Sequence, residues 1–154
     1  MLGRKRAARI LVAVVVPLAI LLAGGCAAGI NHSYDPATNF GPLKTYAWAP
    51  GSAVYSQSSL VEANVQFLAD PLLAKKGFTR ATASPDFVIL VRAESYPVGA
   101  SEGYELRMLD LNLYRPDGRT LIWRGTASGS ISTDAASRDL RNAVQGILAA
   151  FPPK

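Results

Sequence analysis

Alternation of apolar and polar residues predicts β-strands along most of the chain. Residues 43–48 alternate over a strand-length window and stop at Pro50-Gly51. Residues 86–96 contain a run that is apolar on both faces, at 87–91, which favours a central strand covered on at least one side. We also expect a short strand at residues 78–80.

Residues 104–114 and 120–131 form the clearest predicted pair of strands. The turn between them, Arg-Pro-Asp-Gly-Arg at 115–119, predicts a hairpin, because proline presets the first turn position and glycine accepts a positive φ. In the first strand the apolar positions change phase after Met108, so we expect a β-bulge near that residue. The second strand places four apolar residues on one face: Leu121, Trp123, Ala127 and Ile131.

Helical spacing first appears after the capping candidates at residues 56–59. The apolar residues that recur at this spacing are Leu60, Val61, Val65, Leu68 and Leu72. Pro71 either kinks this helix or, together with Asp70, restarts it as a new N-terminus. The helix is predicted to end at Lys75-Lys76-Gly77, because cations are favourable near a helix C-terminus and glycine can adopt the left-handed cap conformation.

A second amphipathic helix follows residues 133–134 and ends before Pro152. Its apolar stripe consists of Leu140, Ala143, Val144, Ile147, Leu148 and Phe151. The order of elements is therefore strand, helix, short strand, three long strands, helix. This order predicts an α/β (α+β) sandwich, in which an antiparallel-rich sheet of four to five strands carries two helices on one face.

The N-terminal 25 residues have the organisation of a lipoprotein signal peptide. Basic residues at positions 4, 5, 6 and 9 precede a 14-residue apolar segment, 10–23, which is shorter than the ~20 residues of a spanning helix. Small residues at 23–25 lead to Cys26, whose thiol would carry diacylglycerol and palmitate. The usual lipobox has Leu where this chain has Ala23. An uncleaved membrane anchor is the alternative, since residues 10–30 carry no charge.

These features divide the chain into a signal peptide (1–25), a lipidated Cys26 with a flexible tether (26–40) and one globular domain (41–154). The tether is inferred from its small, polar and turn-rich composition. Because the basic residues stay in the cytoplasm, the rest of the chain is exported. Ala27, in place of Asp after the cysteine, favours sorting to the outer membrane with the domain facing the periplasm.

Charge and cysteine content narrow the classes of function. The chain has 16 basic and 11 acidic residues, and cleavage would remove four basic ones, so the mature chain would be nearly neutral. The remaining Arg and Lys residues are scattered, so we expect no nucleic-acid interface. Cys26 is the only cysteine, and no disulfide can form within the domain.

The residues that carry chemistry do not assemble into a catalytic or metal site. Residues 99–103 fit the G-x-S-x-G pattern around Ser101, but a strand follows where a hydrolase needs a helix. The sole histidine, His32, lies upstream, where a hydrolase of this kind needs one later in the chain. One histidine and an acylated cysteine cannot hold zinc. We therefore expect a protein that is not an enzyme and has no cofactor or metal.

Aromatic residues on the predicted strands offer a possible binding surface. Tyr46, Trp48, Tyr104 and Tyr114 would form an exposed patch if they share the helix-free face of the sheet. The alternative is that such aromatics fill the core. This alternative is favoured for Trp123, whose alternate neighbours are apolar.

Short motifs in a particular order give the chain a family resemblance. They are Asp35-Pro36 with Phe40, Lys44-Thr45-Tyr46-Ala47-Trp48, Lys76-Gly77-Phe78, Pro85-Asp86-Phe87, Leu121-Ile122-Trp123-Arg124-Gly125 after the Asp-Gly hairpin, and Phe151-Pro152-Pro153. In these motifs residues 31–153 resemble the bacterial lipoprotein family called domain of unknown function 4136. The resemblance implies an envelope lipoprotein with a small α/β sandwich and no established reaction.

Two functions fit these observations. The first is a membrane-tethered binding or scaffold domain that contacts an envelope protein through its helix-free sheet face or an edge strand. The second is a carrier of a small apolar ligand or lipid. A carrier needs a cavity of at least ~300 Å³ between helices and sheet, lined by residues such as Leu68, Leu72, Leu111 and Val144.

Overall fold

A computed structural model describes residues 28–49, 56–98 and 103–154 of the chain. The predicted signal peptide, Cys26 and Ser101 lie outside these residues. In chain order the elements are β1 (Gly29–Tyr34), β2 (Thr45–Trp48), α1 (Ser56–Lys75), β3 (Thr79–Arg80), β4 (Phe87–Val98), β5 (Gly103–Tyr114), β6 (Leu121–Ser132) and α2 (Arg138–Ala149).

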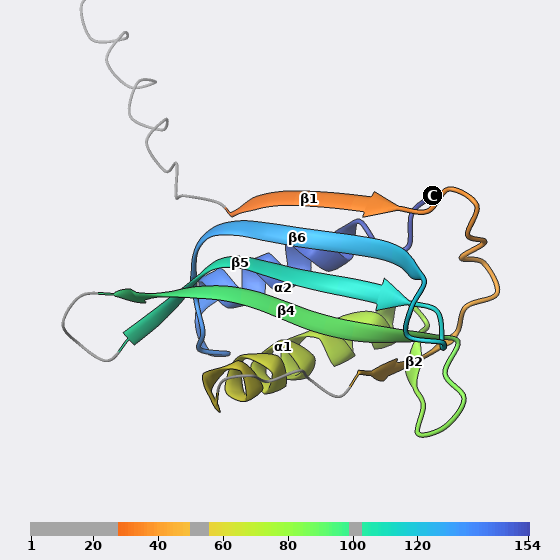
Figure 1. The fold of residues 1–154 in the computed structure, drawn as a ribbon, viewed down its shortest axis with the longest axis horizontal. Helices are drawn as coiled ribbons and strands as arrows, with labels where there is room; N and C mark the ends of the chain where they lie inside the picture. The colour runs from red at the N-terminus through yellow and green to blue at the C-terminus, as the bar shows by residue number, and fades with distance from the viewer. Residues whose placement is uncertain (1–27, 50–55, 99–102) are drawn as a thin grey trace, which may run out of the picture.

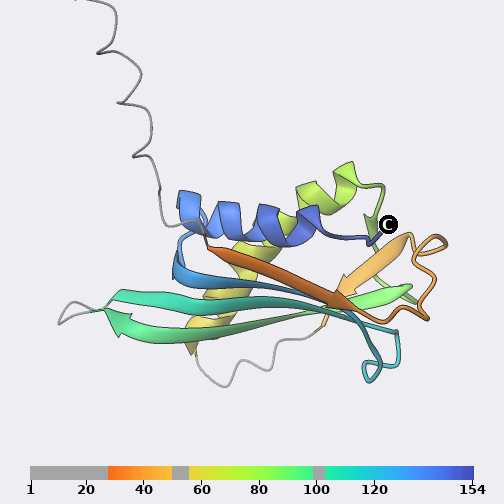
Figure 2. The same ribbon diagram turned by 90° about the horizontal axis from the view of Figure 1, so that it is seen from above.

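The strands form one mixed six-stranded sheet in the order β1-β6-β5-β4-β2-β3 (Figure 1). β1, β6, β5 and β4 pair antiparallel, whereas β2 runs parallel to both β4 and β3. Figure 2 shows α2 lying along one side of the sheet, and α1 packs beside α2 and against β4 and β3. The predicted α+β fold with two helices is therefore confirmed.

β1 is an edge strand in a segment that we predicted to be a flexible tether. The sheet has six strands, not the predicted four to five, because residues 29–34 pair along their whole length with β6. All six residues of β1 are exposed. An exposed edge strand needs no alternating apolar face, so its composition resembles that of a loop.

The β-bulge predicted near Met108 is present in the β4–β5 pairing. Glu94 pairs with Met108 and the next residue, Ser95, pairs with Leu106, which makes Arg107 the extra residue. As a result Leu106, Leu109, Leu111 and Leu113 all face the helices, and each is fully buried. The bulge thus reconciles the two apolar phases of this strand.

α1 is one continuous helix in which Pro71 lies four residues before the end. The predicted interruption at Asp70-Pro71 does not occur. α2 begins after Ser137, whose hydroxyl accepts a hydrogen bond from the Asp139 amide at 3.0 Å. Five residues of its predicted stripe are buried against the sheet: Leu140, Ala143, Val144, Ile147 and Leu148.

The core between helices and sheet is closed at one end by a cluster of aromatic rings. Phe151 lies at its centre, with ring centroids 5.2 Å from both Trp123 and Phe78, and 5.7 Å from Phe87. Trp123 is fully buried, which confirms its predicted place in the core. A Cβ atom at Gly125 would lie 2.3 Å from the Trp123 ring, so glycine is required for this packing.

Asp86 ties the start of β4 to β2. One carboxylate oxygen accepts hydrogen bonds from the backbone amides of Lys44 and Thr45, both at 2.8 Å, and from the Thr45 hydroxyl at 3.0 Å. These three donors hold the pKa of Asp86 below its usual value. The contact joins residues 41 positions apart and fixes the parallel β2–β4 pairing.

Candidate functional site

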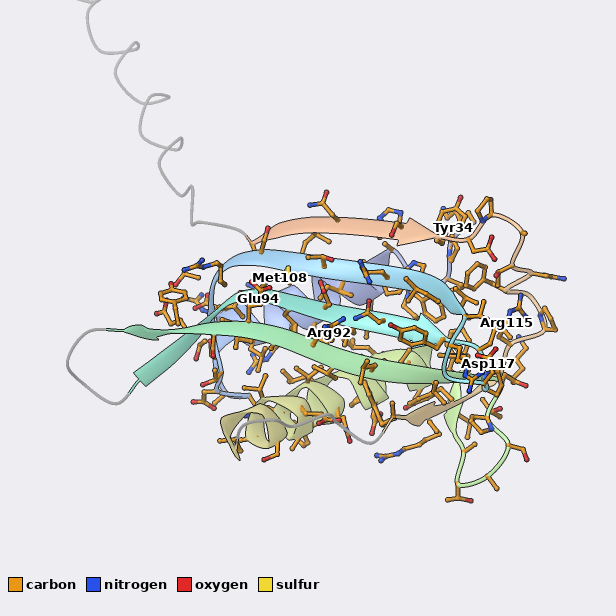
Figure 3. The ribbon with its side chains drawn as sticks, in the orientation of Figure 1. Tyr34, Arg92, Glu94, Met108, Arg115 and Asp117 are labelled. Atoms are coloured by element: carbon orange, nitrogen blue, oxygen red, sulfur yellow. The ribbon has the colours of Figure 1, made fainter. Side chains whose placement is uncertain are left out.

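The face of the sheet opposite the helix-covered core carries a row of polar side chains at its centre. We call Arg92, Asp110, Asn112, Arg124 and Thr126 the polar ladder. The register places Arg92 opposite Asp110 and Asp110 opposite Thr126, while Asn112 lies opposite Arg124. Side chains directly opposite one another share a face, so the five residues form one surface. Figure 3 shows Arg92, Glu94 and Met108 on the side away from the helices.

Two short hydrogen bonds join β5 and β6 within the polar ladder. The Thr126 hydroxyl donates to Asp110 Oδ1 at 2.7 Å, and Arg124 Nε donates to Asn112 Oδ1 at 2.6 Å. Asp110 is 7% exposed and Asn112 is fully buried. Because β5 lies between β4 and β6, neighbouring side chains flank both residues without any helix above them.

Asn112 keeps one hydrogen-bonding group unused. Its Nδ2 atom is buried and has no hydrogen-bond partner among the described residues. Leaving such a donor unpaired costs about 1–3 kcal/mol. Arg92 is exposed, and the one ion pair within the described ranges is Arg80–Asp70, so Arg92 forms none. The surface thus offers the exposed guanidinium group of Arg92, next to the Arg124–Asn112 pair.

A second polar cluster lies on the same face beside the bulge. The Tyr96 hydroxyl donates to Glu105 Oε2 at 2.9 Å, and the Ser130 hydroxyl donates to the same oxygen. These two hydrogen bonds hold the pKa of Glu105 below its usual value, with Ser130 the larger cause. The Arg107 guanidinium lies over the Tyr96 ring, 5.4 Å from its centroid. The cluster continues the polar surface toward the β4–β5 hairpin.

Tyr46 and Trp48 do not belong to the predicted surface. Both turn toward α1, where the Tyr46 hydroxyl and Trp48 Nε1 donate to Asp70 Oδ1 at 2.7 and 2.9 Å. Arg80 completes the contact with an ion pair of 3.2 Å to Asp70 Oδ2. Tyr46 is only 2% exposed, and burial together with the hydrogen bond to Asp70 raises the pKa of its hydroxyl. The cluster fixes α1 to β2 and β3.

The other two predicted aromatics lie on β5. Tyr114 is half-buried at the end of β5, opposite Val88 and Leu121. The backbone of Tyr104 pairs with Pro97, and its side chain lies outside the described part of the structure. Tyr114 is therefore the one predicted aromatic that the structure places beside the polar ladder, since it follows Asn112 by two positions on the same strand.

The remaining chemical candidates stay apart from one another. His32 is exposed on β1, and residues 99–102 of the G-x-S-x-G motif are outside the described ranges. Among the described residues, no three His, Asp or Glu side chains lie together as metal ligands. No helix in the part of the chain that the structure describes is long and apolar enough to cross a membrane.

Sequence reasoning missed the polar ladder and the Asp70 cluster. Asp110 and Asn112 alternate with leucines, a pattern that normally indicates solvent-exposed positions on a half-covered strand. The signal that could have found them is the coincidence of Asp, Asn, Arg and Thr at alternate positions of two strands joined by one turn. Burial of Asn112 could not be inferred, because it depends on the register with β4 and β6.

Comparison with known proteins locates the chain within one family. The family model described as "Domain of unknown function (DUF4136)" matches residues 30–153. A solved DUF4136 family protein from Bacteroides thetaiotaomicron is 14% identical with a TM-score of 0.50, and the alignment covers 80% of this chain and 94% of that one. No curated protein matches the chain.

Two further structures share the fold. A PelC dodecamer from Paraburkholderia phytofirmans is 14% identical, with a TM-score of 0.53 and coverage of 79% of this chain and 95% of that one. A PDZ domain protein from Parabacteroides distasonis is 17% identical, with a TM-score of 0.60 over 82% of this chain. The chain spans 36% of the length of that protein. At these identities the similarity shows a common fold.

Proposed function

This chain belongs to the family described as domain of unknown function 4136, and on that premise we propose that it is a lipid-anchored envelope lipoprotein with a binding or scaffold role. Cys26 carries the lipid, and the domain faces the periplasm from the outer membrane. Its helix-free sheet face contacts an envelope protein. The domain acts without catalysis, cofactor or metal.

The observation that carries this proposal is the pair of guanidinium groups on the helix-free face: Arg92 is exposed and forms no ion pair among the described residues, and Arg124 is held by Asn112 Oδ1. The Nδ2 atom of Asn112 is buried beyond the reach of a partner, so Asn112 contributes to this surface by holding Arg124 in place through its Oδ1 atom. Arg92 and Arg124 flank the same region, and guanidinium groups bind carboxylates with good geometry. The expected partner is therefore a protein that presents a carboxylate side chain to this face.

The composition of the polar ladder supports binding over catalysis. It contains no histidine or thiol, and its carboxylate, Asp110, is already hydrogen-bonded to Thr126. A general base must reach the proton that it removes. Here the one carboxylate is held inside the sheet, with 7% of its surface exposed.

The position of β1 adds a geometric argument about the anchor. Only residues 27 and 28 separate Cys26 from β1, which starts at Gly29. Three residue steps reach at most about 11 Å. A lipidated Cys26 would thus hold the domain close to the membrane surface, so its partner must lie at the same level of the envelope.

Two experiments test the proposal separately. Mass spectrometry of the mature N-terminus should find acylated Cys26 as the first residue, and an intact N-terminus would leave the uncleaved anchor as the correct alternative. Crosslinked envelopes should yield a protein that copurifies with the wild-type chain. This protein should be lost from an Arg92→Ala, Arg124→Ala chain and retained by Arg138→Ala, which removes an exposed arginine of α2. Absence of any reproducible partner would contradict the binding role.

A further inference from the structure

β1 forms one edge of the sheet and leaves one side of its backbone unpaired. The Asp35 amide donates to the Ile122 carbonyl oxygen at 3.0 Å, directly after the last residue pair of β1 and β6. Because hydrogen-bonded and non-hydrogen-bonded pairs alternate in an antiparallel ladder, every second residue from Asp35 back along β1 bonds to β6. The residues between them direct their backbone groups away from the sheet: Ile30, His32 and Tyr34. These groups have no hydrogen-bond partner in the part of the chain that the structure describes, and β1 is the outermost strand (Figure 1).

The side chains of these three residues lie on the helix side of the sheet, opposite buried residues of β6. Ile30 is 37% exposed and Tyr34 is 45% exposed. Ile30 lies against Gly146 of α2, where an added Cβ atom would be 3.0 Å from it. The Tyr34 ring packs edge to face with Phe40, with centroids 6.2 Å apart. Both apolar side chains are thus held from within the domain and still expose part of their surface.

β1 lacks the features that usually protect an edge strand from further pairing. Natural edge strands are protected by short length, charged residues, proline or a β-bulge. Residues 29–34 contain no proline, Lys, Arg, Asp or Glu, and their register with β6 is unbroken. The opposite edge strand, β3, is only two residues long and includes Arg80. β1 is therefore the edge of the sheet that a further strand can extend.

The positions of Ile30 and Tyr34 select a second copy of β1 as the added strand. An antiparallel strand must pair its outward-directed residues with those of β1. For two copies of β1, the register centred on His32 pairs all three such residues, since it places Ile30 opposite Tyr34 on both sides of the axis. Pairs of an aromatic and a β-branched side chain across strands are stabilising. On the other face Asn31 lies opposite Ser33, so each position meets a matching one, as a two-fold interface requires.

α2 presents no charge to the second copy. This helix lies over the edge of the sheet formed by β6 and β1 (Figure 2). Gly146 is its contact with β1, and Asn142 and Ala149 lie on the same side, four positions before it and three after it. Asn142 and Ala149 are exposed. Joining the two edges therefore brings together helix surfaces that are uncharged, and like charges do not oppose the contact.

We propose that two copies of this chain join their sheets edge to edge, with β1 antiparallel to β1 of the copy and the two-fold axis at His32. About six backbone hydrogen bonds form, two for each of the three residue pairs. This contact uses the edge of the sheet and does not depend on the partner proposed for the helix-free face. The two Gly29 residues are six residue steps apart along the strands, or about 20 Å, so both chains can be attached to one membrane.

Cysteine crosslinking of the full-length chain in native membranes tests this register. A mixture of Ile30→Cys and Tyr34→Cys chains should form a disulfide-linked dimer, because the two positions are opposite each other with Cα atoms about 5.5 Å apart. Neither chain should crosslink when expressed alone, because each position is then four residue steps, about 14 Å, from its own copy. The second Ile30–Tyr34 pair stays intact in the mixed dimer. The unchanged chain, which carries Cys26, gives the baseline.

Substitutions of His32 test the backbone hydrogen bonds at the axis. The His32 amide points away from β6, so His32→Pro keeps the pairing with β6 and removes both hydrogen bonds at the axis. In both cysteine chains it should reduce the crosslinked fraction at least about tenfold. His32→Lys places like charges opposite each other and should also reduce this fraction. His32→Thr retains the backbone groups and should preserve most of it. Thermal unfolding of each variant checks the fold, and His32→Lys decides the test if His32→Pro unfolds the domain.

Three outcomes would overturn the proposal. Mixed chains that crosslink no more than the unchanged chain would show that another protein, a lipid or another segment of this chain lies along β1. Crosslinking of Tyr34→Cys alone at the level of the mixed chains would show a parallel or random contact. Crosslinking of the mixed chains that persists with both His32→Pro and His32→Lys would show that β1 does not hold the copies together.

Discussion

The two faces of the sheet are both buried along β5, but by different means. On the helix side, Leu109 and Leu111 are covered by apolar side chains and aromatic rings from the helices and the C-terminal segment. On the other side, Asp110 and Asn112 are buried with no helix above them and are hydrogen-bonded to β6. The same alternation of residues therefore produces a packed core on one face and a polar surface on the other.

The helix-covered face of the sheet therefore contributes mainly to stability, and the helix-free face contributes mainly to function. The helix-covered face gains free energy from apolar burial, which is the dominant favourable contribution to folding. The helix-free face holds a donor on Asn112 that costs free energy in the isolated chain. Substitutions on the first face should therefore act on unfolding, and substitutions on the second should act on binding.

The largest effect is expected from Trp123→Ala. This side chain is fully buried against Phe151, so its loss should lower the free energy of unfolding by about 3–5 kcal/mol, as measured by urea denaturation. Met108→Ala, which truncates a half-buried side chain on the helix-free face, is the control and should cost about 1 kcal/mol. Equal costs for the two substitutions would contradict the distinction between the faces.

Asp70→Ala should have the next largest effect. Its carboxylate accepts hydrogen bonds from Tyr46, Trp48 and Arg80, and the Tyr46 hydroxyl would be left without an acceptor in a buried position. We expect a loss of about 2–3 kcal/mol in thermal or chemical unfolding. Glu62→Ala, on the same helix, should change stability by no more than about 0.5 kcal/mol. A cost for Asp70→Ala as small as that of the control would show that the cluster does not hold α1 in place.

Acid should weaken the contact that joins the parallel and antiparallel parts of the sheet. The pKa of Asp86 is lower in the folded chain than its ordinary value of 3.8, because the amides of Lys44 and Thr45 stabilise the carboxylate. A lowered folded pKa gives stability that is present above pH ~4 and is lost as pH falls through the folded pKa. Unfolding free energies measured from pH 7 to pH 2 should show this decrease, and Asp86→Asn should reduce it. An unchanged pH profile in Asp86→Asn would assign the decrease to other carboxylates.

The smallest effect on stability is expected at the centre of the polar ladder. Asn112→Leu removes the unpaired donor and leaves Arg124, which is half-buried, to bond with water. Removal of the buried unpaired donor offsets the loss of the hydrogen bond from Arg124 Nε, which water can replace, so the free energy of unfolding should change by less than about 1 kcal/mol in urea denaturation. The same substitution should remove the copurifying partner. A loss of more than about 2 kcal/mol would mean that Asn112 serves stability.

Much of the fold could be predicted because its signals are local. The Pro-Asp-Gly turn, the phase change near Met108 and the stripe of α2 each depend on neighbouring residues, and each is confirmed. β1 could not be found in this way. Its residues are exposed, and its backbone pairs with β6, about 95 positions later in the chain.

The candidate site was less predictable, because it depends on register and on long-range contacts. Tyr46 and Trp48 have the composition of a surface patch, but Asp70 of α1 draws both to the helix side of the sheet. The sequence pattern predicts that Asn112 is a solvent-exposed strand residue, but Asn112 is buried between two neighbouring strands. Whether each of these side chains is buried or exposed depends on the arrangement of the strands.

Photocrosslinking from the two faces tests the central claim most directly. A photoreactive residue in place of Arg92, on the helix-free face, is compared with one in place of Gln145, exposed on α2. Both chains are full length and membrane-attached. The account predicts a specific adduct with another envelope protein from position 92 that is lost when Asn112→Leu is added, and none from position 145. An adduct from position 145 alone, or none from either position, would contradict it.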